Sequence, residues 1–460
     1  MSNYNDPIVQ KSINTIRFLA IDGVQKAGSG HPGMPMGVAP LAYHLYKNVM
    51  NHNPANPKWL NRDRFVLSGG HGSMLLYSIL HLSGYELPLD ELKQFRQWGS
   101  LTPGHPEVNH TPGVETTTGP LGQGLANAVG MAMAYEFLSN TFNKDDIKIL
   151  DHYVYAEMGD GDVMEGVSHE VSSFAAHNKL GNLIVIYDDN NVTIDGKVGL
   201  AMSENVMRRY EAYGWHVQRV EDGNNLEELD RAIKNAQVIT DKPSLIAMKT
   251  VIGFGSPNKA NTSAVHGAPL GEDEVEATKK NLGCEDLTPF YVSDDVYAHF
   301  ADIKSKGAEV EKAWNETFEK YKQKYPEDAK LFTDVMAGNF GDEWIEKLPV
   351  VTEWGKKIAT RQASGAVINA IAGTLPTLFG GSADLAPSNN TMMKDIPAFS
   401  ADNKTGRNLH FGIREHGMGS IMNGIVLYGG TKTYGGTFMI FSNYMRPPIR
   451  MAAIMGINPI

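Results

Sequence analysis

Cysteine is almost absent from this chain, which contains a single one, Cys284, in 460 residues. One cysteine excludes an intrachain disulfide and a cluster of thiolate metal ligands. Long apolar runs are missing too, because none reaches the roughly 18 residues that cross a bilayer. The N-terminus also lacks the basic and then apolar pattern of a signal peptide. These absences predict a cytoplasmic protein with no membrane contact.

Basic residues are fewer than acidic ones in this chain. Lys and Arg total 41 against 52 Asp and Glu, a formal net charge of −11, which argues against nucleic-acid or anionic-membrane partners. A phosphate-bearing ligand would therefore need a local cationic pocket. Hydrophobic residues make up 42% and charged residues 20%, as in a soluble globular protein with an ample core. The length predicts two or three domains.

The strongest local pattern is Gly159-Asp160-Gly161, taken together with Asn190-Asn191. Residues 152–158 (HYVYAEM) have the composition of a buried strand, and 183–187 (LIVIY) predict a second one. A helix predicted over roughly 165–180 would join them as a βαβ unit with parallel strands. Asp160 and Asn190 would then lie just past the carboxyl ends of neighbouring strands, where open α/β sheets bind ligands.

These side chains suit a metal–diphosphate site. Mg²⁺ takes about six hard oxygens, often from one or two protein groups together with phosphates. Asp160 offers a carboxylate, Asn190 an amide oxygen and Val192 a main-chain carbonyl, while Ca²⁺ or Mn²⁺ are alternative ions. Gly-Asp-Gly-Asp alone fits a polar turn equally well, but the two asparagines after the second strand favour the metal.

Three Gly- and Pro-rich loops each contain one histidine. His31 follows a helix predicted over residues 8–27, His71 follows a short strand predicted at 64–67 (RFVL), and His105 lies in 102–107 (TPGHPE). A lone loop histidine is more often a surface residue than a catalyst, but three favour imidazoles that donate to phosphate and move protons. A further Gly-rich turn, 118–124, precedes a predicted helix and suits either close cofactor contact or a tight turn.

Several long motifs in the same order along the chain resemble the transketolase family. They are SGHPGMPMG (29–37), GHGSMLLY (70–77), TPGHPE (102–107), ETTTGPLGQG (115–124), GDG (159–161), YDDNN (187–191) and GSPNK followed by HGAPLG (255–271). The resemblance implies an α/β thiamine diphosphate-binding fold with parallel sheets flanked by helices. It also implies a homodimer whose active sites lie at the subunit interface.

The resemblance also implies a domain plan. Residues 1–324 would form the diphosphate-binding domain, 325–355 a linker packed along it, and 356–460 the pyrimidine-binding domain. In that second domain we expect a helix that opens near Arg361, strands at 377–380 and 409–413, and a last helix at 446–455. The pyrimidine-binding domain would be incomplete and the family's C-terminal domain absent, so we expect a truncated gene product with an unfilled sheet edge near residues 454–460.

The family's functional residues map onto matching positions. The resemblance implies catalysis by His31, His71, His105, His266 and the partner subunit's Glu415, which would hydrogen-bond the cofactor's aminopyrimidine ring. It implies cofactor contacts from His71, Gly119, Pro120, Leu121, Gly161, Glu165, Asn190, His266, Glu415, Phe438, Phe441 and Tyr444. It implies metal ligands Asp160, Asn190 and Val192, and substrate contacts from His31, His266, Arg361 and Ser388.

The implied activity moves a two-carbon ketol unit from a ketose phosphate such as xylulose 5-phosphate to an aldose phosphate such as ribose 5-phosphate, in the pentose phosphate pathway. One alternative is a dihydroxyacetone synthase-like or other thiamine diphosphate transferase. Another is an inactive cofactor-binding partner, against which the intact site residues argue. Two departures stand near the site: Asn191, where the family commonly has Gly, and His416, where Phe is common.

Overall fold

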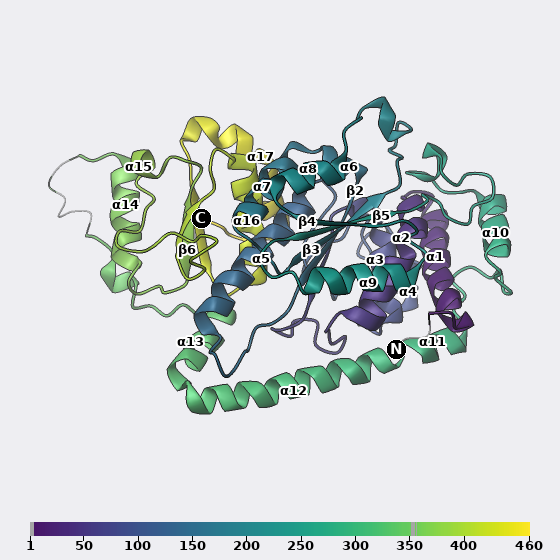
Figure 1. Ribbon diagram of the computed structural model, residues 1–460, viewed down its shortest axis with the longest axis horizontal. Helices are drawn as coiled ribbons and strands as arrows, with labels where there is room; N and C mark the ends of the chain where they lie inside the picture. Colours follow the sequence, from purple (N-terminus) through teal and green to yellow (C-terminus); the bar gives the residue numbers. More distant parts are fainter. Residues whose placement is uncertain (1–3, 351–354, 356) are drawn as a thin grey trace. The chain divides into compact units, whose positions relative to one another are not determined.

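The structure, a computed structural model, describes residues 4–350, 355 and 357–460 (Figure 1). The chain divides into two compact units, each with its own parallel sheet. Unit 1 comprises Met1–Leu125, His152–Ser168 and Gly181–Trp314, and unit 2 comprises Ala126–Asp151, His169–Leu180 and Asn315–Ile460. Part of the predicted linker, 351–354, and the predicted start of the second domain, 356, lie outside the described residues. The domain boundaries stay a prediction.

Unit 1 is built on a five-stranded parallel sheet in the order β1-β2-β3-β5-β4. The predicted βαβ unit is confirmed, since β2 and β3 are parallel neighbours with Gly159 opposite Asp188. The carboxyl ends of these two strands therefore place Asp160 and Asn190 at one sheet edge. The strands are β1 (Arg64–Leu67), β2 (Val154–Gly159), β3 (Leu183–Asp189), β4 (His216–Val220) and β5 (Ser244–Lys249).

Helices cover both faces of this sheet, as a buried parallel sheet requires. Helices α1 (Pro7–Ala27), α2 (Gly33–His44) and α3 (Ser73–Leu82) pack on one another (Figure 1) and share a core with α9 (Leu226–Gln237). Helix α8 (Val206–Tyr213) packs on β4 and β5, and the Tyr210 hydroxyl meets the Met158 sulfur at 3.6 Å.

Local chemistry sets the ends of α1. The Asp6 carboxylate accepts the Ile8 N–H at 3.1 Å, Pro7 occupies the first turn, and Gly28 ends the helix in a left-handed conformation with φ 63°. This confirms the helix predicted over residues 8–27. The other helices that begin in unit 1 are α4 (Leu89–Leu92), α5 (Gln123–Phe142), α6 (Asp160–Met164), α7 (Gly166–His177), α10 (Glu272–Asn281), α11 (Asp294–Phe300) and α12 (Asp302–Lys324).

Unit 2 contains a three-stranded parallel sheet in the order β7-β6-β8. Its strands are β6 (Leu378–Ser382), β7 (Asn408–His410) and β8 (Lys432–Gly436), and its helices are α13 (Pro326–Met336), α14 (Thr360–Ile371), α15 (Ala386–Asn389), α16 (Glu415–Tyr428) and α17 (Arg446–Met455). Strand β7 ends before the predicted residue 413, because Gly412 turns with φ 70° and its carbonyl accepts the Arg414 N–H at 2.8 Å. At the other edge, Ile460 exchanges two backbone hydrogen bonds with Thr433 and Gly435 of β8.

The segment predicted as a linker is structured over most of its described length. Phe332 of α13 packs against Phe142 and Phe318 with ring centroids 5.3 and 5.7 Å apart. Phe340 and Trp344 pack instead on a small core around Leu375. These two aromatic side chains of the second half of the segment thus pack on residues of the second α/β pattern, and the role of 325–355 as a linker stays a prediction. Among the described helices, none is both long and apolar enough to cross a membrane.

Candidate active site

Asp160 belongs to the first of the two loops that the sequence singled out, and its carboxylate bonds to the second. It is 4% exposed, accepts the Asn191 N–H at 3.0 Å through Oδ2, and accepts the Tyr187 hydroxyl through Oδ1. Asn191 makes this contact from a left-handed conformation with φ 62°, which asparagine tolerates better than most residues.

The side-chain amide of Asn190 is held by one hydrogen bond at its nitrogen and one at its oxygen. Its Nδ2 donates to Asp188 Oδ2 at 2.6 Å, and its Oδ1 accepts the Val192 N–H at 3.0 Å. Asp188 is in turn fixed by the Thr250 hydroxyl. Two interactions therefore fix the orientation of this amide, as outer-shell partners do for metal ligands.

These residues fit a hydrated divalent cation bound through oxygens. The Asp160 oxygens accept the Tyr187 hydroxyl and the Asn191 N–H, and a carboxylate has about four acceptor sites in all. Burial raises the pKa of Asp160 to about 6, and a bound cation would offset that cost. Within the described part of the chain, no group of three or more His, Cys, Asp or Glu is arranged to hold a metal. Binding here would depend on the mixed set of carboxylate, amide and carbonyl oxygens together with diphosphate.

Asp162, the second aspartate of the Gly-Asp-Gly-Asp stretch, joins three loops. Its carboxylate accepts the Ser68 hydroxyl at 2.6 Å, the Gly122 N–H at 2.7 Å and the Gly159 N–H at 3.0 Å. It thereby ties the end of β1 and the Gly-rich turn before α5 to the Gly159–Asp162 stretch. Sequence analysis gave it no role, and the only clue was the repeated Gly-Asp.

The structure brings the four candidate histidines of unit 1 together. The His71 ring stacks on His266 with centroids 5.2 Å apart, and His31 lies edge-on to both at 5.1 and 5.7 Å. His105 completes the group at 6.4 Å from His31. The residues come from four separate loops, and Gly253 N–H bonds the Gly33 carbonyl at 2.8 Å, which joins the loops of His266 and His31.

Burial keeps these imidazoles neutral. It lowers the pKa of His31 to about 4, with smaller contributions from the neighbouring His266 and Arg96, and the pKa of His71 to about 3. The pKa values of His105 and His266 are also lowered by burial. Nδ1 of His31 and Nδ1 of His266 are buried and have no hydrogen-bond partner among residues 4–350, 355 and 357–460. Unpartnered, buried nitrogens on these partly buried rings indicate a ligand site.

Glycines bring the remaining predicted cofactor residues close to the cluster. A Cβ on Gly119, which has φ 138°, would lie 3.2 Å from the His105 ring, and one on Gly161 would lie 2.6 Å from Leu121. Gly119 therefore lies against His105, and Leu121, two residues later, lies against Gly161. Glu165 ends α6 as an exposed residue beside Gly122.

In unit 2, Glu415 is the first residue of α16 and is 9% exposed. The first turn of this helix is fixed by Glu170, whose carboxylate accepts the Gly417 N–H at 2.7 Å. Burial, aided by the charge of Glu415, raises the pKa of Glu170. Sequence analysis did not identify Glu170, which lies in an ordinary helical stretch.

The other predicted residues of unit 2 are partly or fully exposed. Phe438, Phe441 and Tyr444 form a row with centroids 6.5 and 6.3 Å apart, because a 3₁₀ helix (Met439–Met445) aligns residues three apart. Arg361 is the second residue of α14 and Ser388 lies in α15, which packs on α14. Both side chains face solvent.

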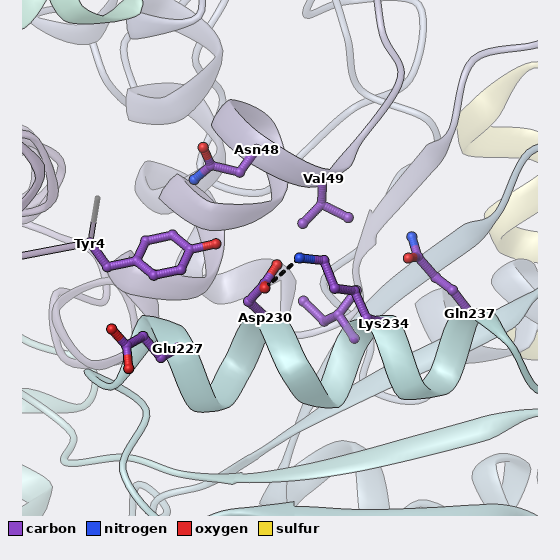
Figure 2. Close-up of a pocket in the computed structure, with 8 residues that line it drawn as sticks. Tyr4, Asn48, Val49, Glu227, Asp230, Lys234 and Gln237 are labelled. Carbon is purple, nitrogen blue, oxygen red and sulfur yellow. Dashed lines mark hydrogen bonds and ion pairs between the residues drawn. The ribbon is translucent and has the colours of Figure 1, made fainter. Parts of the chain in front are cut away.

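A separate cavity of about 500 Å³ is formed by other elements of unit 1 (Figure 2). Figure 2 shows Asp230 and Lys234 of α9, which pair at 2.6 Å, beside Tyr4 and Asn48. The buried His44 lies 3.4 Å from Asp230, and burial lowers the pKa of His44 to about 4. The acidic Asp230 and the basic Lys234 face one another in this cavity.

Comparison with known proteins agrees with this geometry. The sequence model of the transketolase thiamine diphosphate-binding domain matches residues 8–341, and that of the transketolase pyrimidine-binding domain matches 356–460. The transketolase of Geobacillus stearothermophilus is 57% identical over 98% of this chain and 68% of its own length, and that of Bacillus subtilis is 53% identical over 98% and 68%.

Solved structures give the same result. A Pichia stipitis transketolase in complex with sedoheptulose-7-phosphate matches with a TM-score of 0.95 and 45% identity over 97% of this chain and 67% of its own. The transketolase of Campylobacter jejuni matches with a TM-score of 0.89 and 44% identity over 98% and 68%. The chain thus spans about two thirds of the length of these relatives. On its domains, its relatives and its fold, the chain belongs to the transketolase family.

Proposed function

We propose that this protein is a transketolase that uses thiamine diphosphate and Mg²⁺ to transfer a two-carbon ketol unit from a ketose phosphate to an aldose phosphate. The observation that carries this proposal is the cluster of four neutral imidazoles that adjoins the Asp160 loops. A Cβ on Gly267, next to His266, would lie 3.3 Å from His31 and 3.5 Å from Ile194, in the loop that follows Val192. Sugar and diphosphate groups would therefore share one space.

Asp160, Asn190 and the Val192 carbonyl would hold the metal, which we take to be Mg²⁺ with Ca²⁺ or Mn²⁺ as substitutes. His71, Gly119, Pro120, Leu121, Gly161, Glu165 and His266 would line the cofactor in unit 1. When bound, thiamine diphosphate supplies the electron sink that carbon–carbon cleavage of a ketose requires. Burial disfavours the ionised form of Asp160, and a bound cation would stabilise it. Because this cation would also bind the diphosphate, metal and cofactor should bind together.

The histidines would act on the sugar. A neutral imidazole has one donor nitrogen and one acceptor nitrogen. His31 and His266 each have an unpartnered Nδ1. Each ring could therefore donate a hydrogen bond to a carbonyl oxygen or accept one from a hydroxyl group of the sugar. His71 and His105 extend this set and keep water out of the cluster. Arg361 and Ser388 would bind the sugar phosphate, for which a guanidinium group is well suited.

Glu415 would act from the partner subunit in a homodimer and hold a proton at the aminopyrimidine ring. The row of Phe438, Phe441 and Tyr444 would cover that ring. Support for a second chain on this surface comes from Met439 and Ile440 in the same 3₁₀ turn, which are 86% and 73% exposed. Such apolar exposure marks an interaction surface. We assign the enzyme to the pentose phosphate pathway in the cytoplasm.

A coupled assay tests the activity. The protein as produced from its gene is given xylulose 5-phosphate, thiamine diphosphate and Mg²⁺, with either ribose 5-phosphate or formaldehyde as acceptor. Transfer to ribose 5-phosphate is expected. Transfer to formaldehyde alone would identify a dihydroxyacetone synthase, and cofactor binding without any transfer would identify an inactive partner.

Two further measurements test the cofactor and the assembly. Removal of divalent ions with a chelator should abolish thiamine diphosphate binding, and Mg²⁺, Ca²⁺ or Mn²⁺ should restore it. Sedimentation should give a dimer when cofactor and metal are present. Cofactor affinity that survives chelation, or a monomer at assay concentrations, would contradict these assignments.

A further inference from the structure

Glu157 stands in a place where a carboxyl group is uncommon. It lies in β2, flanked in the sheet by Leu67 of β1 and Ile186 of β3, and it is 0% exposed. Glutamate is almost never fully buried unless it is paired. Glu157 is not among the residues of the proposed site, so its burial has another cause.

One carboxyl oxygen of Glu157 holds the turn that leads to His71. Oε2 accepts the Gly69 N–H at 3.3 Å. Gly69 has φ −69° and ψ 60°, and the Gly70 N–H donates to the Ser68 carbonyl at 2.7 Å, which defines an inverse γ-turn. A Cβ on Gly69 would lie 3.1 Å from the same Oε2. The carboxyl group therefore packs directly beneath the middle residue of this turn.

The surroundings of Glu157 favour its uncharged form. Oε1 is buried and has no hydrogen-bond partner within the described part of the chain. The charged groups that act on the side chain are both acidic, Asp188 of β3 and Asp162 of α6. Burial first, and these two carboxyl groups second, raise the pKa of Glu157 well above its ordinary value. An ionised carboxylate with a single long hydrogen bond here would carry a large desolvation cost.

We propose that Glu157 is a positioning residue for His71, and that it holds the Ser68–Gly70 turn as an uncharged acid. The turn sets where His71 leaves the end of β1, and hence the stacking of His71 on His266. The catalytic part of this inference rests on the proposed ketol transfer. The positioning part concerns the protein alone.

Two variants of the protein as produced from its gene separate the hydrogen bond from bulk packing. Glu157→Gln keeps an acceptor oxygen and stays neutral, whereas Glu157→Leu keeps the volume but removes the acceptor. With thiamine diphosphate and Mg²⁺, we expect Glu157→Leu to lower kcat by about tenfold, because a small misplacement of a catalytic group is costly. Glu157→Gln should keep kcat within about twofold of wild type, and KM for the ketose should change less than kcat in both variants.

The matched control for packing is Ile186→Leu, because Ile186 lies opposite Glu157 in the sheet. This variant should behave as wild type.

Two readouts do not depend on ketol transfer. The infrared spectrum of the wild type minus that of Glu157→Gln should contain the band of a protonated carboxyl group at pH 7. With ¹³C-labelled histidine, the His71 resonance should shift in Glu157→Leu and stay in place in Glu157→Gln and Ile186→Leu. If Glu157→Leu does not fold, Glu157→Met removes the same acceptor with a more flexible side chain.

A carboxylate band for Glu157 would overturn the inference, as would a Glu157→Gln variant as impaired as Glu157→Leu. An unmoved His71 resonance in a folded Glu157→Leu protein would also overturn it. If the wild type transfers no ketol unit, the proposed function fails, while the infrared and resonance measurements still decide the role of Glu157.

Discussion

His71 and His266 stack ring on ring, with centroids 5.2 Å apart and planes 21° from parallel, although they stand in loops far apart in the sequence. Two protonated imidazoles would repel each other at this distance. The stack therefore requires that at least one ring is neutral, and burial supplies the reason. His31 lies edge-on to both rings at similar distances, so the same repulsion would act on its protonated form.

The first prediction concerns the protonation of this cluster. Because the pKa of His31 is lowered to about 4 and that of His71 to about 3, both imidazoles should stay neutral as the pH falls through 6.5, the ordinary histidine value. A titration followed by NMR of ¹³C-labelled histidine measures this, with the denatured protein as reference. His105→Asn should raise the pKa of His31, because a neighbouring imidazole that can itself take up a proton is one cause of the lowered value. A His31 resonance that titrates near 6.5 in the folded protein would show that the cluster is open to water.

The second prediction concerns the metal. Asp160→Ala and Asn190→Ala should each weaken Mg²⁺-dependent thiamine diphosphate binding by more than the roughly 10–100-fold that loss of an outer-shell partner costs, because each removes one of few protein oxygens. Calorimetric titration measures the affinity, and circular dichroism checks the fold. Asp195→Ala, an exposed carboxylate in the same loop, is the control and should bind as wild type. Unchanged affinity in either variant would refute its assignment as a ligand.

The centre of the sheet of unit 1 could be predicted because β2 and β3 are short, mostly apolar runs that end in Gly, Asp and Asn. Two such runs with a helix between them fix both the parallel pairing and the edge where Asp160 and Asn190 meet. The gathering of the four histidines could not be derived in this way. Their loops carry no periodicity: the shared Gly- and Pro-rich surroundings suggested a common role for His31, His71 and His105, and only the family resemblance added His266.

The supporting carboxyl groups were beyond the reach of sequence patterns for a different reason. Asp162 reads as part of a polar turn, and its three hydrogen bonds join loops that meet only in the folded chain. Glu157 had a faint signal, a glutamate within an otherwise apolar strand, but its burial depends on the strands on both sides. Strand β7 was predicted too long because the left-handed conformation of Gly412 is not visible in composition.

The third prediction concerns Glu415. Glu415→Ala should leave metal and cofactor affinity within about threefold of wild type but slow exchange of the cofactor C2 proton by at least the roughly hundredfold that general acid–base groups contribute. The measurement is proton NMR after transfer into deuterated buffer. Glu415→Gln keeps the size and the hydrogen bonding but cannot give up a proton, so it should be nearly as slow. Wild-type exchange in both variants would mean that Glu415 serves only the start of α16.

The last prediction concerns the stability of the loop that leads to Gly119. Glu115 accepts two hydrogen bonds from Arg62, both at 2.7 Å, and one from Arg64 at 3.0 Å, and these side chains are at most 10% exposed. Glu115→Gln would leave two buried guanidinium groups without their countercharge, so the free energy of unfolding should fall by about 3–5 kcal/mol. Denaturant unfolding at pH 7 measures it. Asp90→Asn, in the exposed pair with Lys93, is the control and should unfold as wild type.

The same carboxylate predicts a pH dependence with a definite sign. Burial alone would raise the pKa of Glu115, but the charges of Arg62 and Arg64 outweigh it and lower the value from 4.5 to about 2. The unfolded chain therefore takes up this proton first, and the contribution is complete above pH 4.5 and lost as the pH falls toward 2. The wild type should lose its stability advantage over Glu115→Gln across this interval. Equal slopes of unfolding free energy against pH in the two proteins would show that Glu115 does not carry the pairing charge.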